Sequence, residues 1–154
     1  QQFGITILLI THEMDVIQKI CDYVYVLEKG QIVEHNSAIE LFKNPVHTTT
    51  RKFLNTISQR SLSDSLIQQL NLNGAVVRLT FVGESTGKPL IADIAKRFDV
   101  EPNILAANII ELKNGIVGNI VIHVEGSSAK TQEITAYLQQ NGVHIERLGG
   151  EGHD

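Results

Sequence analysis

The feature that most constrains the fold is a regular succession of apolar patterns between residues 75 and 148. Residues 75–82 alternate apolar and polar side chains as a half-buried strand does, whereas residues 89–98 place apolar side chains on one face of a helix. Two more strand patterns, at residues 104–112 and 116–124, flank a sequence typical of a hairpin turn, Lys113-Asn114-Gly115. A second helix capped by Ser127 or Ser128 and a last strand at residues 143–148 complete the series.

The resulting order of elements is strand, helix, strand, strand, helix, strand. This order predicts an antiparallel four-stranded sheet with both helices on one face, which is a ferredoxin-like α+β sandwich. The helix-free face must then be solvated or meet a partner. Leu105, Ile109, Ile120 and Ile122 supply more apolar surface than one buried face requires. We therefore expect two-fold pairing with a second copy of the chain to cover it.

The first half of the chain carries a different pattern. Residues 4–10 (GITILLI) form the continuous apolar run expected of a strand buried in a parallel sheet. Thr11 is predicted to cap a helix that ends at Lys19 or Ile20. The elements expected next are a strand at residues 22–28, its hairpin partner at 31–34, a short helix capped by Ser37, and a helix at 47–57.

A change of composition marks the boundary between the two halves. Residues 56–74 are polar and rich in serine, which indicates a linker that contains at most one weak amphipathic helix. We therefore divide the chain into residues 1–55, a linker at 56–74, and a domain at 75–150.

Two turns at either end of one short helix, within residues 82–109, are the first place to look for a ligand. They contain the run Gly83–Pro89 and the pair Pro102-Asn103, and we expect them to lie near each other. The run GESTGKP resembles a phosphate-binding loop only superficially. It is one residue short between its glycines, and Pro89 stands where a magnesium-binding hydroxyl belongs, so we reject a nucleotide site there.

An amino acid suits these turns better than a nucleotide. Backbone amides at the helix start near Leu90 favour a carboxylate, and the Asn103 side chain offers both a donor and an acceptor. Leu90, Ile91, Ile104 and Leu105 are candidates for an apolar slot. The alternative is that Asn103 only completes an Asx-type turn after Pro102, and that Thr86-Gly87 is only a loop.

The overall charge and the distribution of metal-binding residues exclude several kinds of function. The formal net charge is −4, and no basic run exceeds Lys96-Arg97, so we expect no nucleic-acid partner. His12-Glu13 lacks the second histidine one turn later that a zinc peptidase needs, and the other histidines are scattered, so we expect no metal site.

The single cysteine, Cys21, cannot form an internal disulfide, which favours a reducing compartment. The sequence starts in mid-pattern at Gln1, so we interpret it as a fragment.

The string ILLITHEMDVIQKICDYVYVLEKGQIVEHNSAIELFKNPVHTTTRKFL, residues 7–54, resembles the end of the ATP-binding subunit of an ABC transporter. The resemblance implies that residues 1–55 are a truncated α/β segment of an ABC ATPase domain. It also implies that His12 is the switch histidine, which contacts the ATP γ-phosphate and the catalytic water in the full-length parent. ATP and magnesium would be cofactors of that parent only. A phosphate loop, a magnesium-binding strand and a signature motif are missing from this sequence, so we expect the fragment to be no enzyme.

Residues 78–149 resemble the NIL domain, the ACT-like regulatory domain of methionine-import ABC ATPases, through RLTFVGESTGKPLIADIAKRFDVEPNILAANI and GNIVIHVEGSSAKTQEITAYLQQNGVHIERLG. The resemblance implies that L-methionine binds between paired domains and inhibits transport. It also implies a homodimer, a transmembrane permease subunit as partner, and a peripheral location on the cytoplasmic face of the membrane. The matching ligand positions are Thr86, Gly87, Lys88, Pro89, Leu90, Ile91 and Asn103.

Two alternatives remain open at this point. The chain could be a structural dimerisation module that binds no ligand, or an ATPase that is active in this form. The incomplete phosphate loop disfavours the second alternative.

Overall fold

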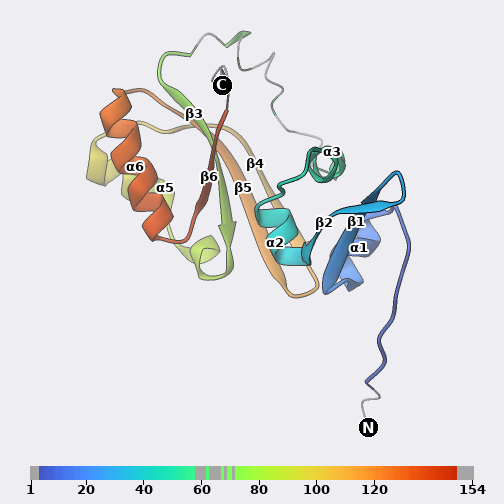
Figure 1. Cartoon of the computed structure of the whole chain (residues 1–154). Coiled ribbons are helices and arrows are strands. Elements are labelled where there is room, and N and C mark those ends of the chain that lie inside the picture. Colours follow the sequence, from blue (N-terminus) through green and yellow to red (C-terminus); the bar gives the residue numbers. More distant parts are fainter. Residues whose placement is uncertain (1–3, 58–61, 63–66, 68, 71, 149–154) are drawn as a thin grey trace.

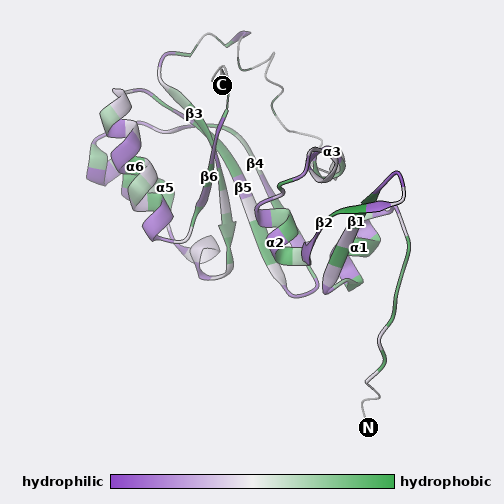
Figure 2. Ribbon diagram, viewed as in Figure 1, coloured by the Kyte–Doolittle hydropathy of each residue, from purple (hydrophilic) through white to green (hydrophobic). Residues whose placement is uncertain are grey.

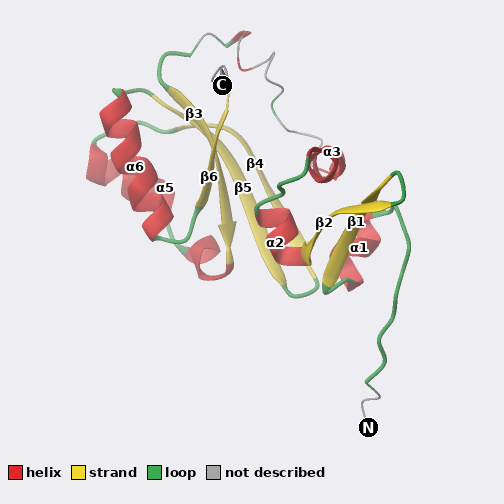
Figure 3. Cartoon of the chain, viewed as in Figure 1, coloured by secondary structure: helices red, strands yellow, loops and turns green. Residues whose placement is uncertain are grey.

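The computed structural model describes residues 4–57, 62, 67, 69, 70 and 72–148, and within them it contains two antiparallel sheets (Figure 1). The larger sheet has four strands in the order β4-β5-β3-β6. Its elements are β3 (Ala75–Val82), α5 (Leu90–Phe98), β4 (Asn103–Leu112), β5 (Gly115–Val124), α6 (Ser128–Gln140) and β6 (His144–Leu148). Figure 3 shows α5 and α6 side by side on one face of this sheet. The predicted ferredoxin-like α+β fold is confirmed.

The core lies between this sheet and its two helices. Along β3, every second side chain faces the helices, and Leu79 at the centre is fully buried. It packs with Ile94 of α5 and Leu138 of α6. Both ends of α6 carry the residues that were predicted to bound it. The Ser127 hydroxyl accepts a hydrogen bond from the Lys130 amide at the start of the helix, and Gly142 adopts a φ of +81° after its end.

The expectation that four apolar residues crowd the helix-free face is wrong for three of them. Ile120 pairs with Leu79 and Ile122 pairs with Val77, so both face the helices and belong to the core. Ile109 is on the same side, because it pairs with Gly118, but it lies on edge strand β4 and is 74 % exposed. Strand register decides the face of each residue, and the local pattern does not fix register.

The helix-free face is instead covered at both ends by other parts of the chain. At one end, Ile67 from the predicted linker packs on Val76 and Val121. At the other end, Phe42 packs on Ile110 and Val117. The rest of the predicted linker helix lies largely outside the described residues. No second copy is therefore required to bury these two apolar zones.

The N-terminal half forms a hairpin with three helices around it. Its elements are α1 (Met14–Ile20), β1 (Tyr23–Glu28), β2 (Gln31–Ser37), α2 (Ala38–Lys43) and α3 (Thr48–Ile57). As predicted, the Ser37 hydroxyl accepts a hydrogen bond from the Glu40 amide and starts α2. Strand β2 continues beyond the predicted Glu34, because His35 and Asn36 still pair with Tyr25 and Val24.

A single carboxylate fixes the start of α3. Glu34 of β2 accepts hydrogen bonds from the backbone amides of Val46 (2.9 Å) and His47 (2.8 Å), and from the Thr50 hydroxyl. Burial raises the pKa of Glu34, but these three hydrogen bonds outweigh burial and lower the pKa below its ordinary value. The sequence offered no local sign of this contact.

The predicted buried strand at residues 4–10 is wrong. These residues run away from the other elements (Figure 1), and Figure 2 shows the run as mainly apolar. Ile7 is 82 % exposed and Ile10 is 93 % exposed. A strand needs a neighbour for its backbone hydrogen bonds, and none of the described strands lies beside this run. Thr11 does not cap α1 either: its hydroxyl accepts a hydrogen bond from the Glu13 amide, and Glu13 occupies the N-cap.

Candidate functional site

The predicted ligand loop follows β3 as a single 3-10 turn, η1 (Gly83–Gly87). Its polar groups are largely satisfied within the loop. The buried Ser85 hydroxyl accepts from the Val82 amide and donates to the Val82 carbonyl, both at 2.9 Å, and the Thr86 hydroxyl donates to the Gly83 carbonyl at 2.6 Å. Of the predicted ligand residues in this region, Thr86, Gly87, Lys88 and Pro89 are exposed. These four could meet a ligand only at the protein surface.

The next two predicted residues differ in their surroundings. Leu90, the first residue of α5, is 2 % exposed and belongs to the core, so it cannot line an open slot. Ile91 is half-buried against the same core. Pro89 precedes the helix at its N-cap and makes no side-chain cap hydrogen bond. The carboxylate-binding potential of this helix start therefore comes from backbone amides.

Asn103 is the first residue of β4 and is exposed. It pairs with His123 of β5, whose Nε2 is 2.7 Å from the Asn73 carbonyl. A register shift between Ile104 and Ala106 bends β4 just after Asn103. Ile104 is 53 % exposed beside it. An amide and an apolar side chain are thus both accessible at this end of the edge strand.

The structure does not bring the two predicted turns together. Asn103 pairs with His123, which in turn pairs with Val76 near the start of β3. Thr86 follows Val82 at the other end of that strand. Six residues of strand at about 3.3 Å per residue separate the two ends by roughly 20 Å. The expectation of neighbouring turns is wrong, because α5 runs back along the sheet and leaves its two loops at opposite ends.

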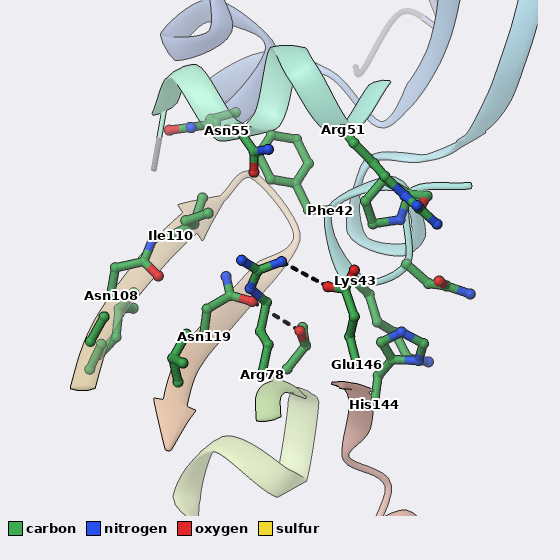
Figure 4. A pocket seen from close by; sticks show the side chains of 18 of the residues that line it. Phe42, Lys43, Arg51, Asn55, Arg78, Asn108, Ile110, Asn119, His144 and Glu146 are labelled. Atoms are coloured by element: carbon green, nitrogen blue, oxygen red, sulfur yellow. Dashed lines mark hydrogen bonds and ion pairs between the residues drawn. The ribbon is translucent and has the colours of Figure 1, made fainter. Parts of the chain in front are cut away.

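A cleft of about 790 Å³ lies elsewhere, between the helix-free face of the sheet and the helices α1, α2 and α3 (Figure 4). Figure 4 shows Arg78, Asn119 and Glu146 on the sheet side, opposite Phe42, Arg51 and Asn55 from the helices. The cationic lining residues are Lys19, Lys43, Arg51 and Arg78, and the acidic ones are Glu111 and Glu146. No sequence pattern pointed to this cleft, because its walls come from distant parts of the chain.

The floor of the cleft is a polar zone across the centre of the sheet. The Arg78 guanidinium donates to the Glu146 carboxylate at 2.7 Å, and the Thr80 hydroxyl is 2.9 Å from the Asn119 side-chain oxygen. Asn108 of β4 is the cross-strand neighbour of Asn119. The side-chain amide nitrogen of Gln18, from α1, also lines the cleft and is buried without a hydrogen-bond partner. This zone separates the two apolar zones of the face.

His12, the predicted switch histidine, is exposed just before α1. No group of three or more metal-binding side chains occurs among the residues that the structure describes. Within the same residues, no helix has the length and apolar character needed to cross a bilayer.

Comparison with known proteins assigns the second half of the chain. Residues 75–147 match the NIL domain family. The crystal structure of the C-terminal domain of an ABC transporter ATP-binding protein from Enterococcus faecalis is 31 % identical to this chain, with a TM-score of 0.50. The match covers 59 % of this chain and all of that one. Residues 75–147 are a NIL domain. The NIL match begins at Ala75, where β3 begins, and ends within β6.

Curated relatives of this NIL-domain chain match over nearly its whole length. Methionine import ATP-binding protein MetN 1 of Bacillus cereus is 42 % identical over 146 residues, or 95 % of this chain and 42 % of the relative. Methionine import ATP-binding protein MetN 4 of Oceanobacillus iheyensis is 38 % identical over 154 residues, or 100 % of this chain and 45 % of the relative. The chain thus spans less than half the length of these relatives.

Proposed function

We infer that this chain is the regulatory C-terminal part of the ATP-binding subunit of an ABC importer for methionine. The observation that supports this most is a NIL domain at residues 75–147 within a chain similar along 95 % or more of its length to methionine import ATP-binding proteins. In this proposal the NIL domain senses internal L-methionine, and the occupied domain inhibits transport.

The chemistry at the start of β4 supports an amino-acid ligand there. The exposed Asn103 amide can donate to the ligand carboxylate and accept from its ammonium group. The exposed Ile104 offers apolar contact for a thioether side chain. Both groups stand on a strand, which holds them more firmly than a loop would.

Pairing of two chains along β4 would complete the site. β4 is an edge strand of ten residues, and its exposed Ile104 and Ile109 lie on the same side. A long apolar edge of this kind favours the addition of another strand. In a two-fold antiparallel pair, Asn103 of one chain lies at the same end of the joint sheet as η1 of the other. The segment Thr86, Gly87, Lys88, Pro89, Leu90 and Ile91 then acts from the second chain, with Leu90 as support in the core.

Regulation follows from differential binding. A ligand that binds only the paired NIL domains stabilises pairing, and pairing in turn constrains the ATPase domains to which they are attached. His12 would take its switch role, with ATP and magnesium, only in the full-length subunit, and the chain alone would not hydrolyse ATP. The full-length subunit would sit on the cytoplasmic face of the membrane, bound to a permease subunit.

Calorimetric titration of the chain with L-methionine tests this proposal. We expect saturable binding that Asn103→Ala abolishes and Asn108→Ala preserves, since Asn108 lies five residues further along β4 and lines the cleft. Loss of binding in Asn108→Ala with retention in Asn103→Ala would move the ligand into the cleft. Absence of heat with the unmodified chain would refute methionine sensing by this fragment.

A dimerisation module without a ligand is the second candidate. The observation in its favour is that the Ser85 and Thr86 hydroxyls are already hydrogen-bonded within η1. Sedimentation would then reveal a dimer whose stability no amino acid changes.

A further inference from the structure

The tip of the β4–β5 hairpin holds the junction between α1 and β1. The Lys113 ammonium lies 2.6 Å from one carboxylate oxygen of Asp22, and the Asn114 amide donates to the other oxygen at 2.7 Å. The Lys113 backbone amide also donates to the Gln18 carbonyl of α1 at 2.7 Å. The hydrogen bonds from Lys113 and Asn114 lower the pKa of the Asp22 carboxyl. In Figure 1 this tip lies beside β1 and α1.

Apolar packing accompanies these polar contacts. Ile17 of α1 and Ile39 of α2 pack on the cluster formed by Phe42, Ile110, Leu112 and Val117. Ile39 also comes close to Gly115, where an added Cβ would lie 3.2 Å from its Cδ1 atom. The side chains of Asp22 and Lys113 are both more than a third exposed, so their ion pair contributes little free energy and mainly fixes the docking geometry. A contact of this kind is easily reversed.

The docked helix occupies the end of the strand that is proposed to pair. Gln18 and Lys19 of α1 face the run Ala106–Glu111 of β4 across the cleft, and Lys113 directly follows β4. The start of the same strand carries Asn103. A second chain aligned along the whole free edge of β4 would come close to the space beside this strand that α1 occupies.

We propose that α1 and a second copy of the chain compete for β4, so that ligand-favoured pairing releases α1 from the β4–β5 hairpin. This inference rests on the proposed pairing along β4 and adds its consequence for the helix that directly follows His12. In the docked state, Asp22, Lys113 and Asn114 hold α1. In the paired state, β4 binds its copy and α1 is free to move. The sensing domain thereby acts on the segment that carries Thr11-His12-Glu13.

The first test needs no ligand. In Asp22→Lys, the Lys113 ammonium repels the new side chain, so α1 amides should exchange with solvent about fivefold faster and self-association should tighten about fivefold. The reciprocal pair Asp22→Lys with Lys113→Asp should restore both values. Glu133→Lys, which makes the same charge change at an exposed position of α6, is the control and should change neither. Unchanged self-association in Asp22→Lys, or no rescue by the swap, would overturn the competition, as would a chain that never self-associates.

The second test separates this inference from the choice of ligand. With L-methionine, α1 amides of the unmodified chain should exchange faster while β4 amides become protected. Protection of β4 without any change in α1 would leave methionine sensing intact and overturn the competition. If L-methionine changes neither segment, methionine sensing by this chain is refuted, and the ligand-free charge swap alone decides the competition.

Discussion

The Arg78 guanidinium donates a 2.7 Å hydrogen bond to the Glu146 carboxylate across the β3–β6 pair, on the helix-free side of the sheet. The two side chains are 25 % and 42 % exposed. They lie between two apolar zones that other segments cover, and the polar centre of this face borders a cleft. The pair also ties the short edge strand β6 to β3.

Replacing Arg78 with alanine should destabilise the chain by about 1 kcal/mol, because a partly exposed ion pair and the packing of the arginine stem are lost together. Urea denaturation of Arg78→Ala, Glu146→Ala and the double variant measures the coupling. We expect a coupling of about 0.5–1 kcal/mol that shrinks at high salt. Strictly additive single effects would mean that the pair itself contributes nothing.

Acid should loosen the contact that Glu34 makes with the start of α3. The folded-state pKa of Glu34 is lowered from its ordinary 4.5, so its stabilisation is fully present above about pH 4.5 and is lost as pH falls through the lower folded value. Glu34→Gln should therefore speed hydrogen exchange at the Val46 and His47 amides at neutral pH, with a difference from the unmodified chain that narrows in acid. The exposed Glu101→Gln is the control. If the difference in exchange rate between Glu34→Gln and the unmodified chain stayed constant with pH, ionisation of Glu34 would not be what stabilises this contact.

Gly74 should tolerate no side chain. Its φ is +117°, and an added Cβ would lie 2.4 Å from the Val124 carbonyl oxygen, which belongs to a strand and cannot move away. Gly74→Ala should cost about 2–3 kcal/mol. Gly142→Ala is the matched control, because Gly142 also has a positive φ, +81°, but open space around it. It should cost only about 1 kcal/mol in thermal or urea unfolding. Equal losses of stability in the two variants would mean that the positive φ, and not the close approach to the Val124 carbonyl, accounts for the effect at Gly74.

Short-range signals explain why most elements could be predicted from the sequence. Ser37 and Ser127 mark helix starts through hydrogen bonds to residues three positions away. Strand β3 was predictable from its alternation of apolar and polar side chains, and alternate residues of this strand form part of the core. The two predicted ligand turns could not be placed in space, because their separation depends on how α5 lies along the sheet.

Long-range contacts explain what the sequence did not reveal. The Asp22–Lys113 contact joins residues 91 positions apart, and the cleft between Phe42 and the sheet depends on the same docking. The prediction for residues 4–10 failed for the same kind of reason: their apolar run describes a strand whose partners the described residues do not provide. The ligand roles of Thr86 and Asn103 stay predictions.

The exposed edge of β4 supplies the most direct test of pairing. Ile109 is 74 % exposed and lies outside the core, so Ile109→Lys should leave the unfolding midpoint of the isolated chain within about 0.5 kcal/mol of the original. The same lysine would lie on the paired edge of both chains, where lost apolar contact and like charges oppose pairing. We expect sedimentation equilibrium to give at least about tenfold weaker self-association. Because binding and pairing are linked, the affinity for L-methionine should fall as well, and higher protein concentration should recover it. Gln132→Lys, which adds the same single charge at an exposed position of α6, is the comparison for charge effects. Unchanged self-association in Ile109→Lys would exclude β4 as the pairing edge, whereas weaker pairing with undiminished methionine affinity would place the ligand within a single chain.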